Sequence, residues 1–414
     1  MSEQQNWAGN RTYQAARWHT PETAVSVQEI VRGSNKLKTL GSRHSFNTVA
    51  DTTSDMVDLQ RLDKIIVLSR DAQTVTIEGG VTYTQLCQFL QEEGFALHNL
   101  ASLPHISVAG ACATGTHGSG SKNGGLATAV SDLTFITASG DPLTLTRADD
   151  VFLGALVHLG GLGVVAQLTL DVEPAYEMRQ TVYRDLDFEV AADNFEAVME
   201  SGYSVSLFTN WQNGRFDQLW LKQRATEPPT PAELFGAKPA IRKLHPIAKL
   251  PAEPCTEQLG QLGPWHERLP HFRPDNTPSA GAELQSEYFV PREHSAEALR
   301  AVAQLGEQLA PQLMVSEVRT IAADELWLSP FYKRPSCAIH FTWQRNWPAV
   351  KKLLPLIETA LAPFDVRPHW GKLFTIPPTQ LQASYPKYAD FQQLLAHYDP
   401  QGKFRNAFMD TYFR

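Results

Sequence analysis

The sequence predicts an α+β protein of two domains, and three observations support this prediction. The chain has 414 residues, enough for two or three domains with substantial cores. Residues 1–175 alternate short apolar strands with a few helical segments. The second half contains longer candidate strands, suited to a mainly antiparallel sheet, together with helices.

In the first part, Thr20-Pro21 predicts the N-cap and the first turn of a helix that ends near Gly33. Its apolar stripe contains Val25, Val27, Ile30 and Val31. Strands are expected at 36–40, 56–59, 64–67 and 74–78, and an amphipathic helix at 82–93, closed by Gly94. A hairpin is expected at 133–137 and 142–146, then a short helix at 152–159 and a glycine turn that leads into a strand at 160–171.

In the second part, apolar patterns predict strands at 204–211, 218–222, 284–290, 313–321 and 337–343, and helices at 295–309 and 348–361. A proline-rich segment at 227–253 has little periodicity and is typical of a long excursion. The polar and aromatic end of the chain is expected to return to the first domain. We therefore predict one domain at 1–175, a second at 176–368, and a C-terminal segment at 369–414 that packs back on the first.

Composition narrows the class of protein. A net charge of −8, with 43% hydrophobic and 19% charged residues, is typical of a soluble globular protein and argues against nucleic acid or an anionic membrane as partner. Residues 1–10 lack the features of a signal peptide, and no run approaches the ~18 apolar residues of a membrane span. The four cysteines are widely spaced, which favours reduced thiols over disulfide or zinc sites. We expect a cytoplasmic protein that uses no metal.

The most unusual stretch is 99–120, which is rich in glycine and hydroxyl residues, contains two histidines and has almost no charge. Its composition disfavours an ordinary helix and suits backbone N–H groups that face phosphates. A second Gly/Ser loop, Gly41-Ser-Arg-His-Ser-Phe-Asn47, follows the strand at 36–40. Neither a Rossmann glycine motif nor a Gly-x-Ser-x-Gly hydrolase motif is present. The residues alone indicate an enzyme with a phosphate-bearing cofactor; the alternative is a glycine-rich surface linker.

Polar pairs on two predicted strands add candidates for a substrate pocket. Glu317 and Arg319 share one face of the strand at 313–321, and His340 and Thr342 share one face of the strand at 337–343. Lys372, in His369-Trp-Gly-Lys372, offers a fixed positive charge. The alternatives are a solvated ion pair, a core histidine and a surface lysine.

The chain resembles the bacterial alditol oxidases of the vanillyl-alcohol-oxidase flavoprotein family, over nearly its whole length. The motifs that carry the resemblance are Gly41-Ser-Arg-His-Ser-Phe-Asn47, Ala101-Ser-Leu-Pro-His-Ile-Ser-Val-Ala-Gly110, Ala113-Thr-Gly-Thr-His-Gly-Ser-Gly120, Gly263-Pro-Trp-His-Glu-Arg-Leu-Pro-His-Phe272, Glu317-Val-Arg319, His340-Phe-Thr342 and His369-Trp-Gly-Lys372. Sugar-lactone oxidases share the first-domain loops, and the match through 263–272 favours the alditol branch.

The resemblance implies that the first domain is an FAD-binding domain of the p-cresol methylhydroxylase type and that the second is a substrate-binding cap. It implies that His44 bonds covalently to the flavin 8α-methyl group. Arg43 departs from the family, which has glycine there, and would restrict the backbone of the loop. The implied FAD-binding residues are His44, Thr39, Leu40, Gly41, Ser42, Arg43, Ser45, Ala101, Ser102, Ser107, Gly110, Thr114, Gly115, Thr116, His117, Gly163, Val165 and Lys372.

The implied reaction is oxidation of the C1 hydroxyl of a polyol such as xylitol or sorbitol, with hydride transfer to flavin N5 and reduction of O2 to H2O2. The implied substrate-binding residues are Ser102, Glu317, Arg319, Thr342 and Lys372, and the implied catalytic residues are Arg319, Lys372, Glu317 and His340. Lys372 would stabilise the reduced flavin, and one of the other three would help to remove the hydroxyl proton. Small Ala101 would leave room for O2. We expect a monomer. The alternatives are a sugar-1,4-lactone oxidase or dehydrogenase of the same family, and a non-catalytic carbohydrate-binding flavoprotein.

Overall fold

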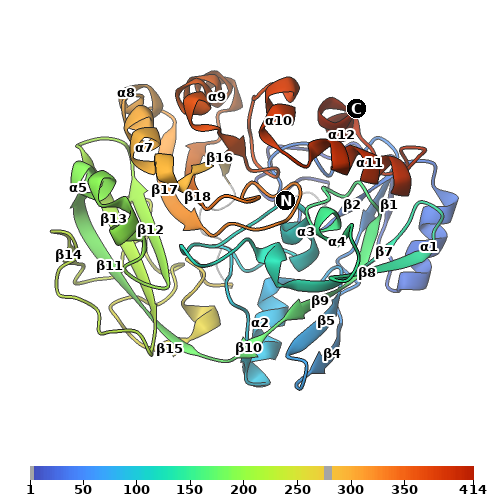
Figure 1. Cartoon of the computed structure of the whole chain (residues 1–414), viewed down its shortest axis with the longest axis horizontal. Helices are drawn as coiled ribbons and strands as arrows, with labels where there is room; N and C mark the ends of the chain where they lie inside the picture. Colours follow the sequence, from blue (N-terminus) through green and yellow to red (C-terminus); the bar gives the residue numbers. More distant parts are fainter. Residues whose placement is uncertain (1–3, 275–281) are drawn as a thin grey trace.

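The computed structural model describes residues 4–274 and 282–414 and confirms the predicted two-domain α+β architecture. Figure 1 shows the two parts side by side: a long-stranded sheet with α5, α7 and α8 on the left, and smaller sheets with α1 on the right and α2 at the bottom, near the middle. The last helices of the chain lie along the top of the molecule (Figure 1). None of the helices within the described ranges is both long and apolar enough to cross a membrane.

The first part contains two main sheets and one short strand pair. A parallel sheet has the order β1-β3-β2, an antiparallel sheet has the order β4-β5-β9-β7-β8, and β6 pairs with β10. The predicted strands and the predicted hairpin are confirmed. The strands are β1 (Arg17–His19), β2 (Leu37–Leu40), β3 (Asp55–Asp58), β4 (Ile65–Ser69), β5 (Thr74–Glu78), β6 (Phe95–Ala96), β7 (Val130–Ile136), β8 (Pro142–Thr146), β9 (Val164–Asp171) and β10 (Glu173–Pro174).

The predicted start of the first helix was wrong. Helix α1 (Ala24–Gly33) is capped by Thr23, whose side chain accepts a hydrogen bond from the Ser26 N–H, and not by Thr20. Val25 is therefore 61% exposed, while Val27 and Val31 face the core. Helix α2 (Tyr83–Glu92) has the expected position and begins with a reciprocal capping box between Thr82 and Gln85. Helix α4 (Phe152–Ala155) covers only the start of the predicted 152–159 segment.

The composition of residues 99–120 argues against a helix, but the segment contains one. Val108–Ala113 forms a short helix, α3, and five of its six residues are buried. Tertiary burial overrides the poor helix propensity of glycine here, because small side chains let the segment pack against its neighbours. Gly110, inside the helix, lies so close to Ser107 that a Cβ there would be 2.7 Å from Ser107 Oγ.

The second part is organised around a nine-stranded sheet of order β14-β11-β13-β12-β17-β18-β16-β19, with β15 paired to β11. The five predicted strands are confirmed, but β11 was missed, although it has eleven residues and a largely buried sequence. The strands are β11 (Glu177–Asp187), β12 (Ser204–Thr209), β13 (Arg215–Arg224), β14 (Lys238–Pro239), β15 (Gly263–Pro264), β16 (Glu283–Pro291), β17 (Leu313–Ile321), β18 (Ser336–Gln344) and β19 (Arg367–Pro368).

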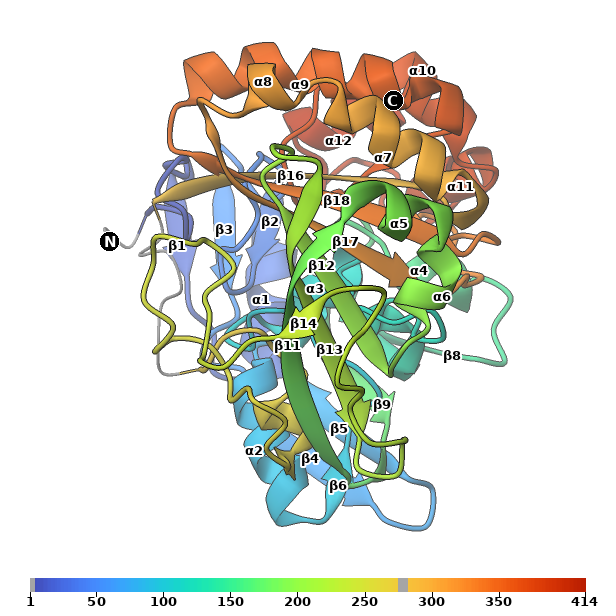
Figure 2. The same ribbon diagram turned by 90° about the vertical axis from the view of Figure 1, so that its left-hand side faces the viewer.

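The predicted helix at 295–309 is interrupted. It consists of α7 (Ser295–Ala303) and α8 (Gly306–Leu309), and Gly306 lies so close to Trp211 that a Cβ would be 2.3 Å from the Trp211 carbonyl oxygen. Helix α9 (Trp347–Leu361) is close to prediction, and α7 and α9 pack on each other and on β16 (Figure 2). The helices not predicted are α5 (Phe188–Asp193), α6 (Phe195–Met199), α10 (Pro378–Ser384), α11 (Tyr388–Tyr398) and α12 (Ala407–Phe413).

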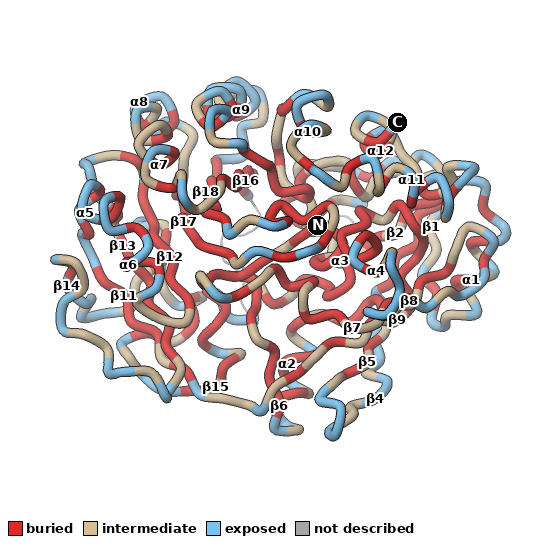
Figure 3. The backbone as a smooth tube through the Cα atoms, viewed as in Figure 1, coloured by how far each residue is buried: buried red, intermediate tan, exposed pale blue. Residues whose placement is uncertain are grey.

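The C-terminal residues contact the first part of the chain. The Leu37 N–H donates to the Lys403 carbonyl at 2.9 Å, and Asn406 Nδ2 donates to the carbonyls of Thr48, Val49 and Asp51. The tube in Figure 3 is largely buried where the two parts meet, in the middle of the molecule. The centre of the molecule is therefore the place where loops from both parts and the C-terminal segment come together.

Candidate functional site

One large cavity lies where the two parts meet. It encloses about 1730 Å³ of empty space, its open mouth included. Twenty-one predicted site residues line it; Gly115 does not. The lining residues are Thr39, Leu40, Gly41, Ser42, Arg43, His44, Ser45, Ala101, Ser102, Ser107, Gly110, Thr114, Thr116, His117, Gly163, Val165, Glu317, Arg319, His340, Thr342 and Lys372. Gly115, with φ +68°, instead packs against Pro330.

Two loops form one wall of the cavity and are bonded to each other. The Ser42 N–H donates to Ser107 Oγ at 3.3 Å, and the Ser107 N–H donates to Ser42 Oγ at 3.1 Å. A Cβ on Gly41 would lie 2.3 Å from the same Ser107 Oγ, so the close approach of the loops requires glycine there. Arg43 has φ +61°, in the left-handed region, and its guanidinium donates to Asp58 at 2.6 Å. The sequence predicted that arginine in place of glycine would restrict the backbone here, and Arg43 does adopt a conformation that favours glycine.

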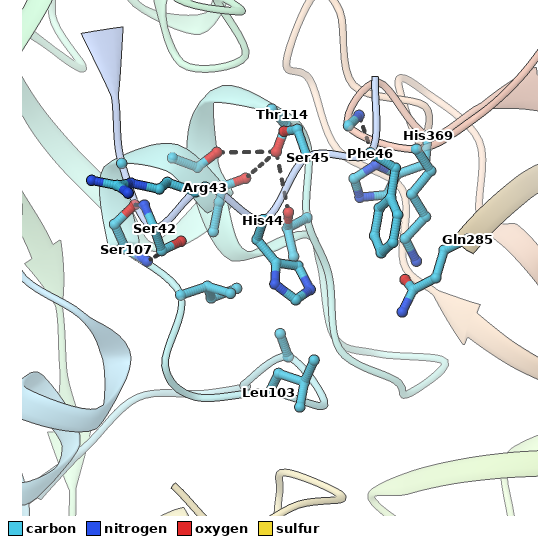
Figure 4. Close-up of a pocket in the computed structure, with 18 of the residues that line it drawn as sticks. Ser42, Arg43, His44, Ser45, Phe46, Leu103, Ser107, Thr114, Gln285 and His369 are labelled. Carbon is cyan, nitrogen blue, oxygen red and sulfur yellow. Dashed lines mark hydrogen bonds between the residues drawn. The ribbon is translucent and has the colours of Figure 1, made fainter. Parts of the chain in front are cut away.

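His44 lies at the tip of the first loop, and Figure 4 shows its ring pointing into the cavity, toward the space between Leu103 and Gln285. The Trp7 ring packs 4.5 Å from the His44 ring, and His105 Nε2 lies 3.4 Å from His44 Nδ1. Burial, with smaller contributions from His105 and Lys372, holds the pKa of His44 well below its usual range. The imidazole of His44 is therefore neutral at neutral pH, and its lone pair is available for bonding.

The opposite wall is the inner face of β17 and β18. Glu317 pairs in register with His340, so the two predicted polar pairs lie side by side on one face of the sheet. All four side chains are buried and line the cavity, so the alternative of a solvated Glu–Arg pair is excluded. Arg319 Nε lies 3.5 Å from Glu317 Oε1.

Glu287, on β16, is a buried carboxylate of the cavity lining that the sequence-based predictions missed. Its carboxylate accepts from Arg319 at 2.6 Å through Oε1 and from Lys372 Nζ at 2.7 Å through Oε2, and its side chain is fully buried. Burial alone would raise the pKa of Glu287, but Lys372 and Arg319 hold it well below its usual range. A signal was available, since Gln285 and Glu287 alternate on one face of a strand that had been predicted.

Lys372 reaches Glu287 from the C-terminal segment because the Gly/Ser loop holds its turn in place. Asn47 Nδ2 donates to the carbonyls of Trp370 and Lys372 at 2.7 and 2.9 Å, and the Phe46 N–H donates to the Gly371 carbonyl at 2.8 Å. Trp370 beside it is fully buried. The loop that carries His44 and the turn that carries Lys372 therefore form one unit.

Several buried polar atoms of the lining have no hydrogen-bond partner among the described residues. They include both ring nitrogens of His340 and Thr39 Oγ1. Burial, followed by the positive charge of Lys372, lowers the pKa of His340 to about 3, so its ring is neutral at neutral pH. Unpaired buried polar atoms cost ~1–3 kcal/mol each, and a polar ligand in the cavity would satisfy them.

The 263–272 motif also reaches the site, through a residue that had not been selected. His271 lines the cavity, and His271 Nε2 lies 2.7 Å from Glu317 Oε1. The backbone N–H groups of His271 and Phe272 both donate to the Ser102 carbonyl at 3.2 Å. This motif therefore contacts two of the predicted substrate-binding residues.

Comparison with known proteins agrees with this geometry. An FAD binding domain family matches residues 15–146, and a D-arabinono-1,4-lactone oxidase family matches residues 282–412. An alditol oxidase from Streptomyces sp. (strain IKD472 / FERM P-14339) is 48% identical over 98% of this chain and 97% of its own length. An L-gulonolactone oxidase from Mus musculus is 26% identical over 99% of this chain and 98% of its own. An L-gulono-1,4-lactone dehydrogenase from Mycobacterium tuberculosis (strain ATCC 25618 / H37Rv) is 26% identical over 97% of this chain and 96% of its own length.

Solved structures show the same fold. A cholesterol oxidase from B. sterolicum superposes with a TM-score of 0.80 at 14% identity, covering 99% of this chain and 96% of that one. Identity this low bears on the fold alone. The 48% identity over almost the full length of both chains bears on the family. The chain therefore belongs to the vanillyl-alcohol-oxidase family of FAD-dependent oxidoreductases, in its alditol oxidase branch.

Proposed function

We propose that this protein is an alditol oxidase that converts the C1 hydroxyl of a polyol such as xylitol or sorbitol to the aldehyde, with O2 as acceptor. One observation carries the proposal: a single cavity joins the two bonded Gly/Ser loops to six polar side chains of the proposed substrate site, four of them buried and two partly buried. Those side chains are Ser102, Glu317, Arg319, His340, Thr342 and Lys372.

The residues present fit FAD. The two loops approach each other so closely that a side chain would not fit at Gly41. Thr39 Oγ1 is buried in the cavity lining and has no hydrogen-bond partner among the described residues. His44 presents a neutral ring to the same space, and we propose that it forms the covalent bond to the flavin 8α carbon. That bond would replace one C–H bond of the methyl group and the N–H bond of the ring, with the two electrons and two protons taken up by O2 to give H2O2. FAD bound in this cavity would supply the acceptor for the hydride of the substrate carbon, and O2 would be the final oxidant and leave as H2O2.

The chain's own residues divide the remaining work. We assign the removal of the hydroxyl proton to His340, because it is neutral and both its ring nitrogens lack a partner in the described structure. Glu317 is a poorer base, since Arg319 and His271 outweigh the effect of burial and lower its pKa. Lys372 remains a positive charge beside Glu287 and is suited to stabilise negative charge that develops on the acceptor.

The charges of the site fit an uncharged substrate. Two cations, buried Arg319 and partly buried Lys372, face the buried carboxylates Glu287 and Glu317, and a third buried carboxylate, Glu283, lines the same cavity. An anionic substrate would leave an excess of negative charge in a buried place, whereas hydroxyl groups of a polyol can both donate to and accept from these groups. The balance favours a neutral, hydroxyl-rich substrate.

A sugar-1,4-lactone is the second candidate substrate class, because the family that matches residues 282–412 is described as a D-arabinono-1,4-lactone oxidase. Identity favours the polyol: the alditol oxidase shares 48% with this chain and the two lactone enzymes share 26%.

The test is anaerobic mixing of the purified yellow protein with xylitol, sorbitol, L-gulono-1,4-lactone or D-arabinono-1,4-lactone. We expect the polyols to bleach the flavin and air to restore its colour with formation of H2O2. Bleaching by a lactone alone would replace the polyol with the second candidate. Reoxidation by a dye but not by air would indicate a dehydrogenase. If neither a polyol nor a lactone bleaches the flavin, the chain is not this enzyme.

We further propose the division of the chain into an FAD-binding domain at 1–175, a cap at 176–368 and a returning segment at 369–414; residues 1–3 and 275–281 lie outside the described structure. The contacts of Leu37 with Lys403 and of Asn406 with the 48–51 loop support the return of the C-terminal segment to the first domain.

We also propose a cytoplasmic monomer, and the four buried free cysteines support the cytoplasmic location. A mass near 46.0 kDa in light scattering would agree with a monomer, and twice that mass would refute it.

A further inference from the structure

A buried lysine and a buried histidine stand behind the substrate face of the cavity, and the reaction proposed above does not use either of them. Lys222 lies on β13, and His271 ends the 263–272 motif. Both are almost fully buried. A buried ammonium group is expensive unless its donors are satisfied, so its partners are informative.

The partners of Lys222 determine the protonation of His271. Burial lowers the pKa of Lys222 to about 7, so the group is mainly an ammonium at pH 6. An ammonium group has three donors, and Lys222 Nζ has three acceptors: the Leu269 carbonyl, the Pro270 carbonyl at 3.1 Å and His271 Nδ1 at 3.0 Å. Because Lys222 donates to Nδ1, that nitrogen carries the lone pair and the ring proton sits on Nε2. Nε2–H then donates to Glu317 Oε1 over 2.7 Å.

This chain of bonds orients the Glu317 carboxylate. Oε1 accepts from His271 and lies 3.5 Å from Arg319 Nε. Within the described part of the chain, no hydrogen bond is made to the other oxygen, Oε2, and Glu317 lines the cavity. With Oε1 engaged, Oε2 is the oxygen left for a ligand in the cavity.

We propose that Lys222 and His271 are positioning residues that hold Glu317 in the orientation in which it accepts a substrate hydroxyl, a role that rests on the polyol function proposed above. Lys222 fixes the tautomer of His271, and the hydrogen bond from His271 fixes the orientation of the Glu317 carboxylate. The same segment holds the Ser102 carbonyl through two backbone N–H groups, so it positions two groups of the substrate site together. The 263–272 motif thus acts as a determinant of polyol affinity.

The first experiment needs no substrate, and its one variant serves only to assign a signal. In ¹⁵N-histidine NMR spectra of the FAD-loaded wild type at pH 6, the His271 signal is identified by its loss in His271→Gln. We expect the Nε2–H tautomer with a bare Nδ1. A proton on Nδ1 would overturn the proposal, whether or not the protein oxidises polyols.

The second experiment measures the KM for xylitol against kcat in Lys222→Met, His271→Phe and the double variant. In these variants Glu317 loses the bond that orients its carboxylate. We expect KM to rise about 10- to 100-fold, with a smaller change in kcat, because Glu317 binds the substrate before and during the reaction. Since both residues act through one bond to Glu317, the double variant should be no worse than His271→Phe alone. His271→Gln, which keeps an N–H donor in place of Nε2–H, should recover part of the affinity.

Two results would overturn the positioning role: wild-type KM in both single variants, or fold-changes that multiply in the double variant. Wild-type protein that polyols fail to bleach would instead refute the proposed function, and the NMR result would still decide the tautomer.

A pH profile separates positioning from a merely structural role. The charged and titratable groups around the Lys222–His271 pair are Glu317, Arg319 and Cys255, and burial together with Lys222 lowers the pKa of His271 to about 4. Removal of the lysine charge raises that pKa, and protonated His271 again donates from Nε2. KM of Lys222→Met should therefore fall as the pH is lowered from 7 to 5, and a KM that stays high throughout would contradict the mechanism.

Discussion

The substitution Glu287→Gln tests the central electrostatic feature of the site. Glu287 is fully buried and accepts from two cations, at 2.6 Å from Arg319 and 2.7 Å from Lys372. Glutamine keeps the shape and one acceptor oxygen but removes the negative charge that balances those cations. Loss of one partner from a buried ion pair costs ~3–5 kcal/mol, a large part of the ~5–15 kcal/mol that holds a typical protein folded. We expect the free energy of unfolding of the variant to be lower by about 3–5 kcal/mol at pH 7.

The pH dependence gives the prediction a sign. Because the pKa of Glu287 is depressed in the folded state, its contribution to stability is fully present above the unfolded value of about 4.3 and is lost as the pH falls toward the folded value. The gap between wild type and variant should therefore be constant from pH 7 to about pH 5 and narrow below that.

The assay is urea unfolding of the FAD-loaded proteins, followed by tryptophan fluorescence at pH 7 and pH 4. The matched control is Glu325→Gln, which removes an exposed carboxylate 3.6 Å from Lys333 and should change stability by less than about 1 kcal/mol. If Glu287→Gln behaves like this control at pH 7, or if its deficit does not shrink in acid, Glu287 does not balance the two cations.

Four further predictions follow from the site. Denaturation in acid should leave the flavin attached to the wild type and to the surface control His397→Ala but release it from His44→Ala; release from the wild type would refute the covalent bond. His340→Gln should slow flavin reduction by xylitol about 10²- to 10⁴-fold in stopped-flow measurements, and an unchanged rate would exclude His340 as the base. In the wild type, the acid limb of kcat/KM from this residue should lie near the His340 pKa of about 3 rather than near 6.5, because a neutral imidazole is needed. Lys372→Met should also slow flavin reduction at saturating xylitol, while exposed Lys351→Met should not; equal rates in the two variants would remove Lys372 from the reaction.

Local patterns in the sequence predicted many of the strands and helices, although one clear pattern was missed. Strand β5 was predicted at its observed bounds, because Thr74 to Glu78 alternate between faces. Helix α11 was missed although it carries the signal of one buried face, through Tyr388, Phe391, Leu394 and Leu395. Helix α3 was not recoverable in this way, because its glycine and small side chains are favoured by close packing and not by propensity.

The candidate site shows the same division. Alternation placed Glu317 with Arg319 and His340 with Thr342, since side chains two apart on a strand share a face. The pairing of β17 with β18, and the neighbouring position of β16, depend on long-range register. Glu287 is 32 residues from Arg319 and 85 from Lys372 along the chain, so no local pattern could show that one carboxylate bonds both.

By itself, the sequence determined that the protein is α+β and which polar residues lie on inward strand faces, and it predicted a phosphate-bearing cofactor from two Gly/Ser loops. Tertiary structure alone decided how the buried charges are arranged: Glu287 between two cations, and Lys222 behind His271 and Glu317. The physical reason is that propensity and alternation act between near neighbours, whereas a buried charge is stable only beside partners that the fold brings from distant strands.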